Sequence, residues 1–178
     1  SKQGGFEIYV NDAELGSQLW DELFAQGEEL NVKAGCPNLI ERIESGLLSF
    51  GGDMGYDTTP FECGLDKYVS LEADIESLSI DALRKRPAKT RLMGLVIDRQ
   101  GKLKDLRLFS GGREIGVITS NTWSPKYHTH LSFAKCDINC IAETQELHVI
   151  SSTGEVPARI TELPFNFEAL GLKSLNSR

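Results

Sequence analysis

The chain has 178 residues, of which 40% are hydrophobic and 25% charged, and its 26 acidic side chains outnumber 19 basic ones. This composition is sufficient for a folded core and excludes a disordered protein. The net charge of −7 argues against a nucleic-acid partner, because such a protein needs a basic surface to displace the counterions of the phosphates. No stretch approaches the roughly 20 apolar residues that span a membrane, so we expect no membrane partner.

The four cysteines form neither a CxxC pair nor a dense disulfide framework. Free thiols, together with an N-terminus that has no apolar signal core, predict a cytoplasmic protein. Cys136 and Cys140 are close in sequence, and His128 and His130 would share one strand face. A zinc site would have to use these four residues, but no second ligand pair has the usual spacing, so we predict no metal.

The segment that begins at Phe6 alternates as a β-strand does. Phe6, Ile8 and Val10 would share one face, whereas Glu7 and Tyr9 would share the other. This strand would begin almost at the first residue, with no earlier element to pair with it. We therefore expect that an upstream part of the protein is missing from this chain.

An amphipathic helix is predicted next. Asn11 and Glu14 have the spacing of a capping box, which would begin the helix. Gly27 would end it in a left-handed conformation, and a short strand would follow near 30–33. The apolar stripe of the helix would consist of Leu15, Leu19, Trp20, Leu23 and Phe24.

Two further helices and a loop complete the first part of the chain. Pro37 suits the first turn of a second helix. The glycine-rich residues 51–60 have the composition of a loop, which we expect Asp53 to order. A short third helix is predicted over 80–85. The buried stripe of the second helix would be Leu39, Ile40, Ile43 and Leu47.

After a basic, proline-interrupted linker at 84–89, short β-rich runs alternate with turn residues. These runs are 91–98, 103–109, 114–120, 128–134, 146–150 and 156–163. Strands at this spacing predict a small antiparallel barrel or sandwich. The fold class is therefore α+β, with one unit at residues 1–87 and an all-β unit at residues 88–178.

Seven short segments carry a resemblance to a known family. They are Gly5-Phe6-Glu7-Ile8-Tyr9, residues 41–54 (Glu-Arg-Ile-Glu-Ser-Gly-Leu-Leu-Ser-Phe-Gly-Gly-Asp-Met), residues 59–65 (Thr-Pro-Phe-Glu-Cys-Gly-Leu), Met93-Gly94-Leu95, residues 116–120 (Gly-Val-Ile-Thr-Ser), Trp123-Ser124-Pro125 and Leu163-Pro164-Phe165. Together they resemble the tetrahydrofolate-dependent aminomethyltransferases, which are the glycine-cleavage T-proteins and their relatives. The resemblance implies that residues 1–87 are the C-terminal portion of the folate-binding domains and that residues 88–178 form the small antiparallel Greek-key β-barrel of that fold.

Residues 35–44 (Gly-Cys-Pro-Asn-Leu-Ile-Glu-Arg-Ile-Glu) depart from the T-protein form, which usually carries Ala-Arg-Asp where 37–39 stands. They look like the dimethylsulfoniopropionate demethylases of the same family. The resemblance implies methyl transfer from this small-molecule donor, with tetrahydrofolate as cofactor, by a longer enzyme of which this chain is part. A glycine-cleavage aminomethyltransferase and a non-catalytic folate-binding module stay open as alternatives.

The resemblance also implies roles for three residues. Glu7 matches the family glutamate that binds the pterin, and Arg42 matches an arginine whose planar fork suits an anionic substrate or the glutamate tail of the cofactor. Tyr9 matches a tyrosine that lines the substrate site of the demethylases. The catalytic aspartate of the family lies upstream of the matching segments, so the catalytic residues stay unknown.

Other interpretations of these residues stay open. Glu7 could be a solvated strand carboxylate and Tyr9 an exposed strand residue. An ion pair of Arg42 within its own helix is disfavoured, because no acid lies four residues before or after it. Without the upstream half, we expect weak folate binding and an apolar surface that favours self-association.

Overall fold

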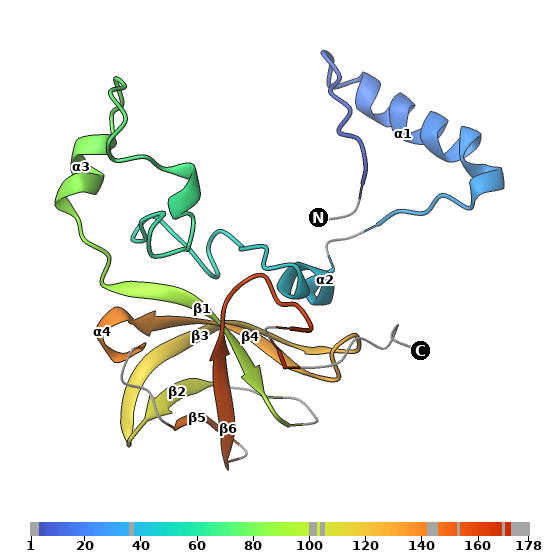
Figure 1. Cartoon of the computed structure of the whole chain (residues 1–178). Coiled ribbons are helices and arrows are strands. Elements are labelled where there is room, and N and C mark those ends of the chain that lie inside the picture. Colours follow the sequence, from blue (N-terminus) through green and yellow to red (C-terminus); the bar gives the residue numbers. More distant parts are fainter. Residues whose placement is uncertain are drawn as a thin grey trace. The chain divides into compact units, whose positions relative to one another are not determined.

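The structure is a computed structural model of the chain (Figure 1). It describes residues 4–35, 38–99, 103, 106–141, 146–152, 154–168 and 170–171. The chain divides into two compact units, Ser1–Asn38 and Leu39–Arg178, which are described one at a time. Among the described residues, no helix has both the length and the hydrophobicity that crossing a lipid bilayer requires.

The first unit is built around helix α1 (Leu15–Gln26), which is followed by the short 3-10 helix η1 (Glu28–Leu30). The helix lies where its apolar stripe predicts it, but the predicted capping box is wrong. No side-chain hydrogen bond caps the helix at Glu14. Instead, the Glu14 amide donates to Asp12 Oδ1 at 2.9 Å, so the acid next to Asn11 accepts the hydrogen bond.

Gly27 ends α1 as predicted, but for a different physical reason. Its φ is −91°, outside the left-handed region, and its amide donates to Leu23 O at 3.0 Å. A Cβ at this position would lie 2.5 Å from Val32 Cγ2. The chain therefore requires glycine here because Val32 packs too close for a side chain. The left-handed residue of this turn is Asn31, with a φ of 55°.

The two strands predicted in the first unit do not form. Neither 5–10 nor 30–33 is a β-strand, and within residues 4–35 no ladder supplies the backbone partners that a strand needs. Apolar side chains therefore stay exposed, among them Phe6, which is 98% exposed.

The second unit contains a closed antiparallel barrel. Its strands are β1 (Thr90–Ile97), β2 (Arg107–Ser110), β3 (Arg113–Ser124), β4 (Thr129–Asp137), β5 (Leu147–Ser151) and β6 (Gly154–Thr161). Around the barrel their order is β1-β4-β3-β2-β5-β6. Strands β2 to β4 form a meander, and β1 lies beside β4, which is a Greek key; the pairing of β1 with β6 closes the barrel (Figure 1).

All six β-rich runs are confirmed as strands, although the second becomes a strand only at Arg107. The α+β class and the Greek-key barrel are confirmed with them. The interior of the barrel is filled by fully buried side chains such as Leu95, Leu108 and Val149. The β-rich composition that predicted these strands fits this burial, since β-branched and other apolar side chains pack well on a pleated, partly buried surface.

Helix α2 (Leu39–Glu44) packs on the barrel through a second hydrophobic cluster. Ile43 is fully buried there with Leu131, and the rings of Phe133 and Phe165 stack with centroids 6.2 Å apart. The predicted stripe of this helix is only partly buried, because Leu39 is 51% exposed. Pro37, predicted in its first turn, lies outside the described residues.

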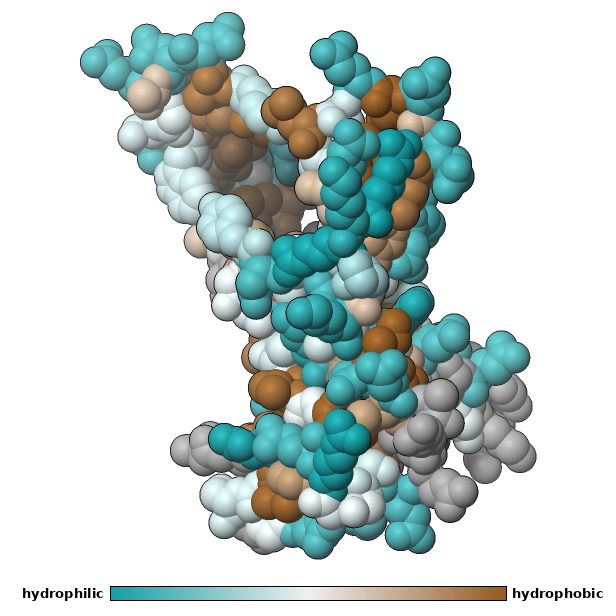
Figure 2. Space-filling view, turned by 90° about the vertical axis from the view of Figure 1, so that its left-hand side faces the viewer, coloured by the Kyte–Doolittle hydropathy of each residue, from teal (hydrophilic) through white to brown (hydrophobic). Residues whose placement is uncertain are grey.

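The described residues of the second unit also form three short helices. They are η2 (Asp66–Tyr68), α3 (Ile80–Lys85) and α4 (Ile138–Ile141), and α3 has the bounds that were predicted for it. Exposed hydrophobic side chains remain in this unit, including Phe50, Tyr56, Tyr68, Ile75 and Leu78. Figure 2 shows hydrophobic side chains, in brown, at the molecular surface among hydrophilic ones in teal.

Candidate functional site

Glu7 and Tyr9 lie next to each other in the first unit, although no strand forms there. The Tyr9 hydroxyl donates a hydrogen bond to Glu7 Oε2 at 2.6 Å. This bond stabilises the protonated phenol and so raises the pKa of Tyr9. Both side chains are exposed, Tyr9 by 84%. The pair thus presents a carboxylate and a phenol ring to solvent, side by side.

Arg42 belongs to the second unit, where it joins α2 to a loop and to the barrel. Its Nη1 donates to Leu47 O at 2.9 Å and to Asp53 Oδ2 at 2.7 Å. Its Nη2 donates to Ser120 Oγ at 2.8 Å, and the guanidinium carbon lies 5.7 Å from the centre of the Phe133 ring. These contacts use three of the five N–H groups that a guanidinium has.

Asp53 is the acid at the centre of this network and is only 3% exposed. Its Oδ1 accepts hydrogen bonds from the hydroxyls of Thr119 and Ser120, each at 2.6 Å. Its Oδ2 accepts from the Ser49 amide at 2.9 Å and from Arg42. Burial opposes ionisation of this carboxyl, but the four donors outweigh it and lower the pKa of Asp53. The expectation that Asp53 orders its loop is confirmed.

Helix spacing does not indicate this ion pair, because no acid lies four residues before or after Arg42. The true partner lies eleven residues downstream, in the loop. One signal was present: Arg42 and Asp53 fall within the same family-like segment, 41–54. Two opposite charges within one such segment are candidates for a structural pair.

Glu62 is a second buried carboxylate that the sequence did not single out, and it is 7% exposed. Its Oε2 accepts from the amide and the hydroxyl of Thr59, at 2.9 and 3.1 Å. Its Oε1 accepts from the Thr90 hydroxyl at 3.1 Å and the Lys89 amide at 3.4 Å. Burial opposes ionisation of Glu62, but these donors outweigh it and lower the pKa to about 2. The network fastens the loop at Thr59 to the first residue of β1.

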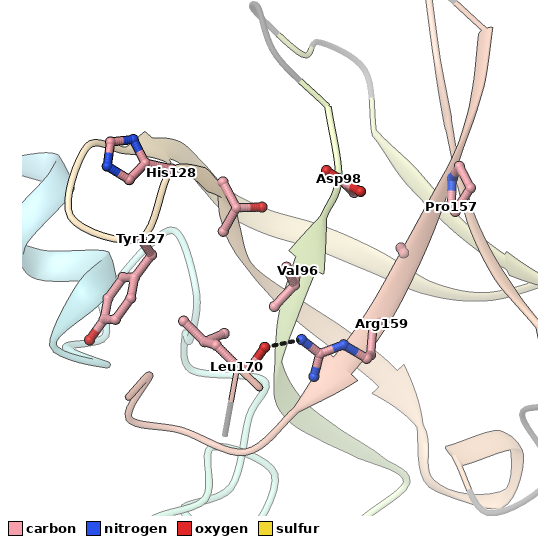
Figure 3. Close-up of a pocket in the computed structure, with 9 residues that line it drawn as sticks. Val96, Asp98, Tyr127, His128, Pro157, Arg159 and Leu170 are labelled. Atoms are coloured by element: carbon pink, nitrogen blue, oxygen red, sulfur yellow. Dashed lines mark hydrogen bonds between the residues drawn. The ribbon is translucent and has the colours of Figure 1, made fainter. Parts of the chain in front are cut away.

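A cavity of about 340 Å³ opens where β1, β4 and β6 approach one another (Figure 3). Asp98, His128 and Arg159 contribute its charged and titratable groups, and Tyr127 and Leu170 contribute apolar surface. Arg159 Nη2 donates to Leu170 O at 2.8 Å, the bond that is dashed in Figure 3. None of the residues that the resemblance singles out lines this cavity.

The described residues include no group of three or more His, Cys, Asp or Glu side chains that could hold a metal ion. Cys136 and Cys140 are both buried, and burial raises the pKa of the Cys136 thiol to about 12. Cys36 lies outside the described residues. The two buried carboxylates described above, Asp53 and Glu62, bond to hydroxyl, amide and guanidinium donors.

Two family models match the chain, one after the other. A model described as the GCVT N-terminal domain matches residues 1–73. A model described as the glycine cleavage T-protein C-terminal barrel domain matches residues 90–166, which include all six strands of the closed barrel.

Two curated proteins of known name are similar to this chain over most of its length. A dimethylsulfoniopropionate demethylase from Ruegeria pomeroyi is 40% identical over 167 residues, which are 91% of this chain and 45% of that protein. An aminomethyltransferase from Aquifex aeolicus is 32% identical over 164 residues, or 92% of this chain and 45% of that protein. The chain thus spans less than half the length of these curated relatives.

The crystal structure of the glycine cleavage system aminomethyltransferase T from Bartonella henselae has a TM-score of 0.55 with this structure. The superposition covers 70% of this chain and 37% of the other, with 24% sequence identity. At this identity the likeness shows that the two chains share a fold.

Proposed function

Because the chain belongs to the glycine cleavage T-protein family, we propose that it is part of a tetrahydrofolate-dependent enzyme that takes a methyl group from dimethylsulfoniopropionate. One observation carries the choice of donor: identity with the demethylase is 40%, against 32% with the aminomethyltransferase from Aquifex aeolicus. The two comparisons cover nearly the same part of this chain, so the difference is not one of coverage.

The exposed pair of Glu7 and Tyr9 fits a cofactor and a donor of this kind. The Glu7 carboxylate would accept hydrogen bonds from the amino and ring N–H groups of the pterin. The face of the Tyr9 ring would attract the positive sulfonium of the donor. In the structure the only hydroxyl proton of Tyr9 is donated to Glu7, so the bond holds both side chains together while leaving the ring face exposed.

Arg42 is proposed to bind a carboxylate, either that of the donor or the glutamate tail of the cofactor. Its bonds to Leu47, Asp53 and Ser120 hold the guanidinium in one orientation and use three N–H groups. The remaining N–H groups would meet the ligand, and 20% of the side chain is exposed. A rigidly held fork binds a carboxylate at a lower entropic cost than a free one.

The proposed reaction places modest demands on the protein. Tetrahydrofolate, when bound, would supply the nitrogen that accepts the methyl group. A sulfonium is already an activated leaving group, so the residues of this chain need only orient the donor and exclude water. Expulsion of an amine from an aminomethyl donor would require an acid as well, and this difference separates the two enzyme hypotheses chemically.

The organisation of the chain is proposed on the same basis. Residues 1–87 would be the C-terminal portion of the folate-binding domains and 88–178 the barrel, which the two matched ranges, 1–73 and 90–166, support. The cytoplasmic location and the lack of a nucleic-acid partner stay predictions.

A direct assay tests the proposal. The gene product that contains this chain is incubated with tetrahydrofolate and dimethylsulfoniopropionate, and methylmercaptopropionate and methyltetrahydrofolate are measured by mass spectrometry. Stoichiometric formation of both is expected. Activity with aminomethyl-lipoyl protein alone would reject the proposal in favour of an aminomethyltransferase. Tetrahydrofolate binding without transfer from either donor would identify a non-catalytic binding module.

A further inference from the structure

The cavity where β1, β4 and β6 approach one another carries opposite charges that the proposed function does not use. Its volume of about 340 Å³ lies near the lower end of the range for small-molecule pockets, which is roughly 300–1,000 Å³. The described residues that line it all belong to the second unit. A cavity with an apolar wall and a few convergent polar groups is the usual form of a small-molecule site.

The two opposite charges of the cavity come from neighbouring strands. Arg159 of β6 is the register partner of Val96 in the antiparallel pairing of β1 with β6. Asp98 lies two residues beyond Val96, and all three residues line the cavity. Residues in such a diagonal relationship are about 7–8 Å apart. A small ligand that carries complementary charges at its two ends would therefore bridge Asp98 and Arg159.

The guanidinium of Arg159 is oriented by the chain itself. Its Nη2 donates to Leu170 O at 2.8 Å, and Figure 3 shows the group pointing toward Leu170 rather than toward Asp98. A guanidinium has five N–H groups in a planar fork, which matches the two oxygens of a carboxylate. An oriented fork also loses less entropy when it binds. This end of the cavity is suited to a carboxylate.

The opposite end of the cavity favours a primary ammonium. Asp98 is exposed, and a carboxylate accepts hydrogen bonds, which an ammonium donates. A methylated sulfonium has no N–H group and binds best to an open aromatic face. Tyr127 does not offer such a face, because it is only 4% exposed. The Phe167 ring and the Lys126 ammonium lie 4.8 and 4.7 Å from the centre of the Tyr127 ring.

We propose that this cavity binds a short ω-amino acid. Its carboxylate would meet Arg159, its ammonium would meet Asp98, and its methylene chain would lie on the apolar surface of Val96 and Pro157. The inference goes beyond the proposed function and does not depend on it, because the proposed methyl donor carries a sulfonium and no ammonium. The cavity would thus let the barrel respond to a second class of small molecule.

A titration followed by nuclear magnetic resonance tests the inference on the isotope-labelled chain of 178 residues. The probe is γ-aminobutyrate, and saturable shifts are expected in the amides of residues 96–98, 128–129, 158–159 and 170. Butyrate and butylamine each carry only one of the two charges, so each should bind at least about fivefold more weakly. Dimethylsulfoniopropionate keeps the carboxylate but lacks the ammonium, and it should also bind more weakly.

Matched variants assign the binding to the two charged side chains. Arg159→Gln and Asp98→Asn each remove one charge and should each weaken γ-aminobutyrate binding at least about fivefold. Arg113→Gln and Asp81→Asn remove the same charges elsewhere, from side chains that are 73% and 79% exposed. These two controls should change the dissociation constant by less than about twofold.

Loss of the bond between Arg159 and Leu170 is controlled separately. Arg159→Lys keeps the positive charge and should restore part of the affinity that Arg159→Gln loses. Asp98→Asn and the comparison of γ-aminobutyrate with butyrate on the unaltered chain leave that bond in place. They therefore test the ligand preference without disturbing Leu170.

Several results would overturn the inference. They are shifts that do not saturate, saturable shifts confined to other residues, equal affinity for γ-aminobutyrate and butyrate, and equal effects of the cavity variants and their controls. Equal affinity for dimethylsulfoniopropionate would overturn the assignment to an ammonium ligand. None of these measurements involves methyl transfer, so the inference and the proposed function can fail independently.

Discussion

Thr119 and Ser120 are neighbours in β3, yet both donate a hydrogen bond to the same oxygen, Asp53 Oδ1, at 2.6 Å. Neighbouring side chains of a regular strand point to opposite faces, so this arrangement needs an irregularity. The register of β3 with β4 shifts between Ile118 and Ser120, a β-bulge that adds one residue to β3. The bulge turns both hydroxyls toward the loop, which is one of the recognised uses of such irregularities.

The two hydroxyls should contribute unequally to stability. Ser120 Oγ donates to Asp53 and also accepts from Arg42 Nη2 at 2.8 Å, so it bonds to both charged groups of the network. The Thr119 hydroxyl bonds to only one of these two charged groups, Asp53. Hydrogen bonds to charged groups contribute about 1.5–3 kcal/mol each. Ser120→Ala should therefore lower the free energy of unfolding by more than Thr119→Val does. Urea unfolding followed by tryptophan fluorescence checks this, and a larger effect of Thr119→Val would contradict it.

Because Asp53 belongs to a buried ion pair, its substitution should lower the free energy of unfolding more than substitution of Asp57, the other acid of its loop. Asp53→Asn leaves the Arg42 charge uncompensated, and breaking a buried pair in this way costs about 3–5 kcal/mol. Asp57→Asn is the matched control, because its side chain is 81% exposed and lies 3.8 Å from Lys135; it should cost less than about 1 kcal/mol. If the two variants had similar midpoints of urea unfolding, the hydrogen bonds around Asp53 would contribute little to the free energy of unfolding.

The lowered pKa of Glu62 should make the free energy of unfolding depend on pH in the acidic range. Its pKa falls from an ordinary value of 4.5 to about 2 on folding, so the unfolded chain binds the proton more readily. The stabilisation is therefore present above about pH 5 and is lost as the pH falls toward about 2. The lowered pKa of Asp53 acts in the same direction.

Two substitutions isolate the part that belongs to Glu62. Glu62→Gln should reduce the slope of the free energy of unfolding against pH below about pH 5, since the titrating group is gone. Thr90→Val keeps the carboxylate but removes one of its donors, so its slope should be intermediate. Chemical unfolding at several acidic pH values gives these slopes, and three identical slopes would assign the pH dependence to other groups.

The Glu7–Tyr9 hydrogen bond predicts a change in the titration of a tyrosine. The bond raises the pKa of Tyr9, because loss of the phenol proton removes the bond and places two negative charges together. Glu7→Gln should lower this pKa toward 10. Ultraviolet absorbance of tyrosinate measures it, and a Tyr9→Phe variant identifies the Tyr9 signal among the four tyrosines. An unchanged curve for Glu7→Gln would mean that the pair does not persist in solution.

Much of the barrel follows from the sequence alone. Short β-rich runs separated by turn residues identify all six strands, and local signals also place α1 and α3. These features are predictable because the residues that decide them are near neighbours in the chain. The Greek-key order was not visible in the pattern and came from the family resemblance.

The tertiary structure decides what depends on distant residues. The segment 5–10 has the pattern of a strand but remains unpaired, since pairing needs a second backbone that no local pattern supplies. Arg42 has no acid partner on its own helix, yet it bonds to Asp53 and to Ser120, which is 78 residues away. A sequence states which side chains are available for such contacts, but only the folded chain brings them within hydrogen-bonding distance.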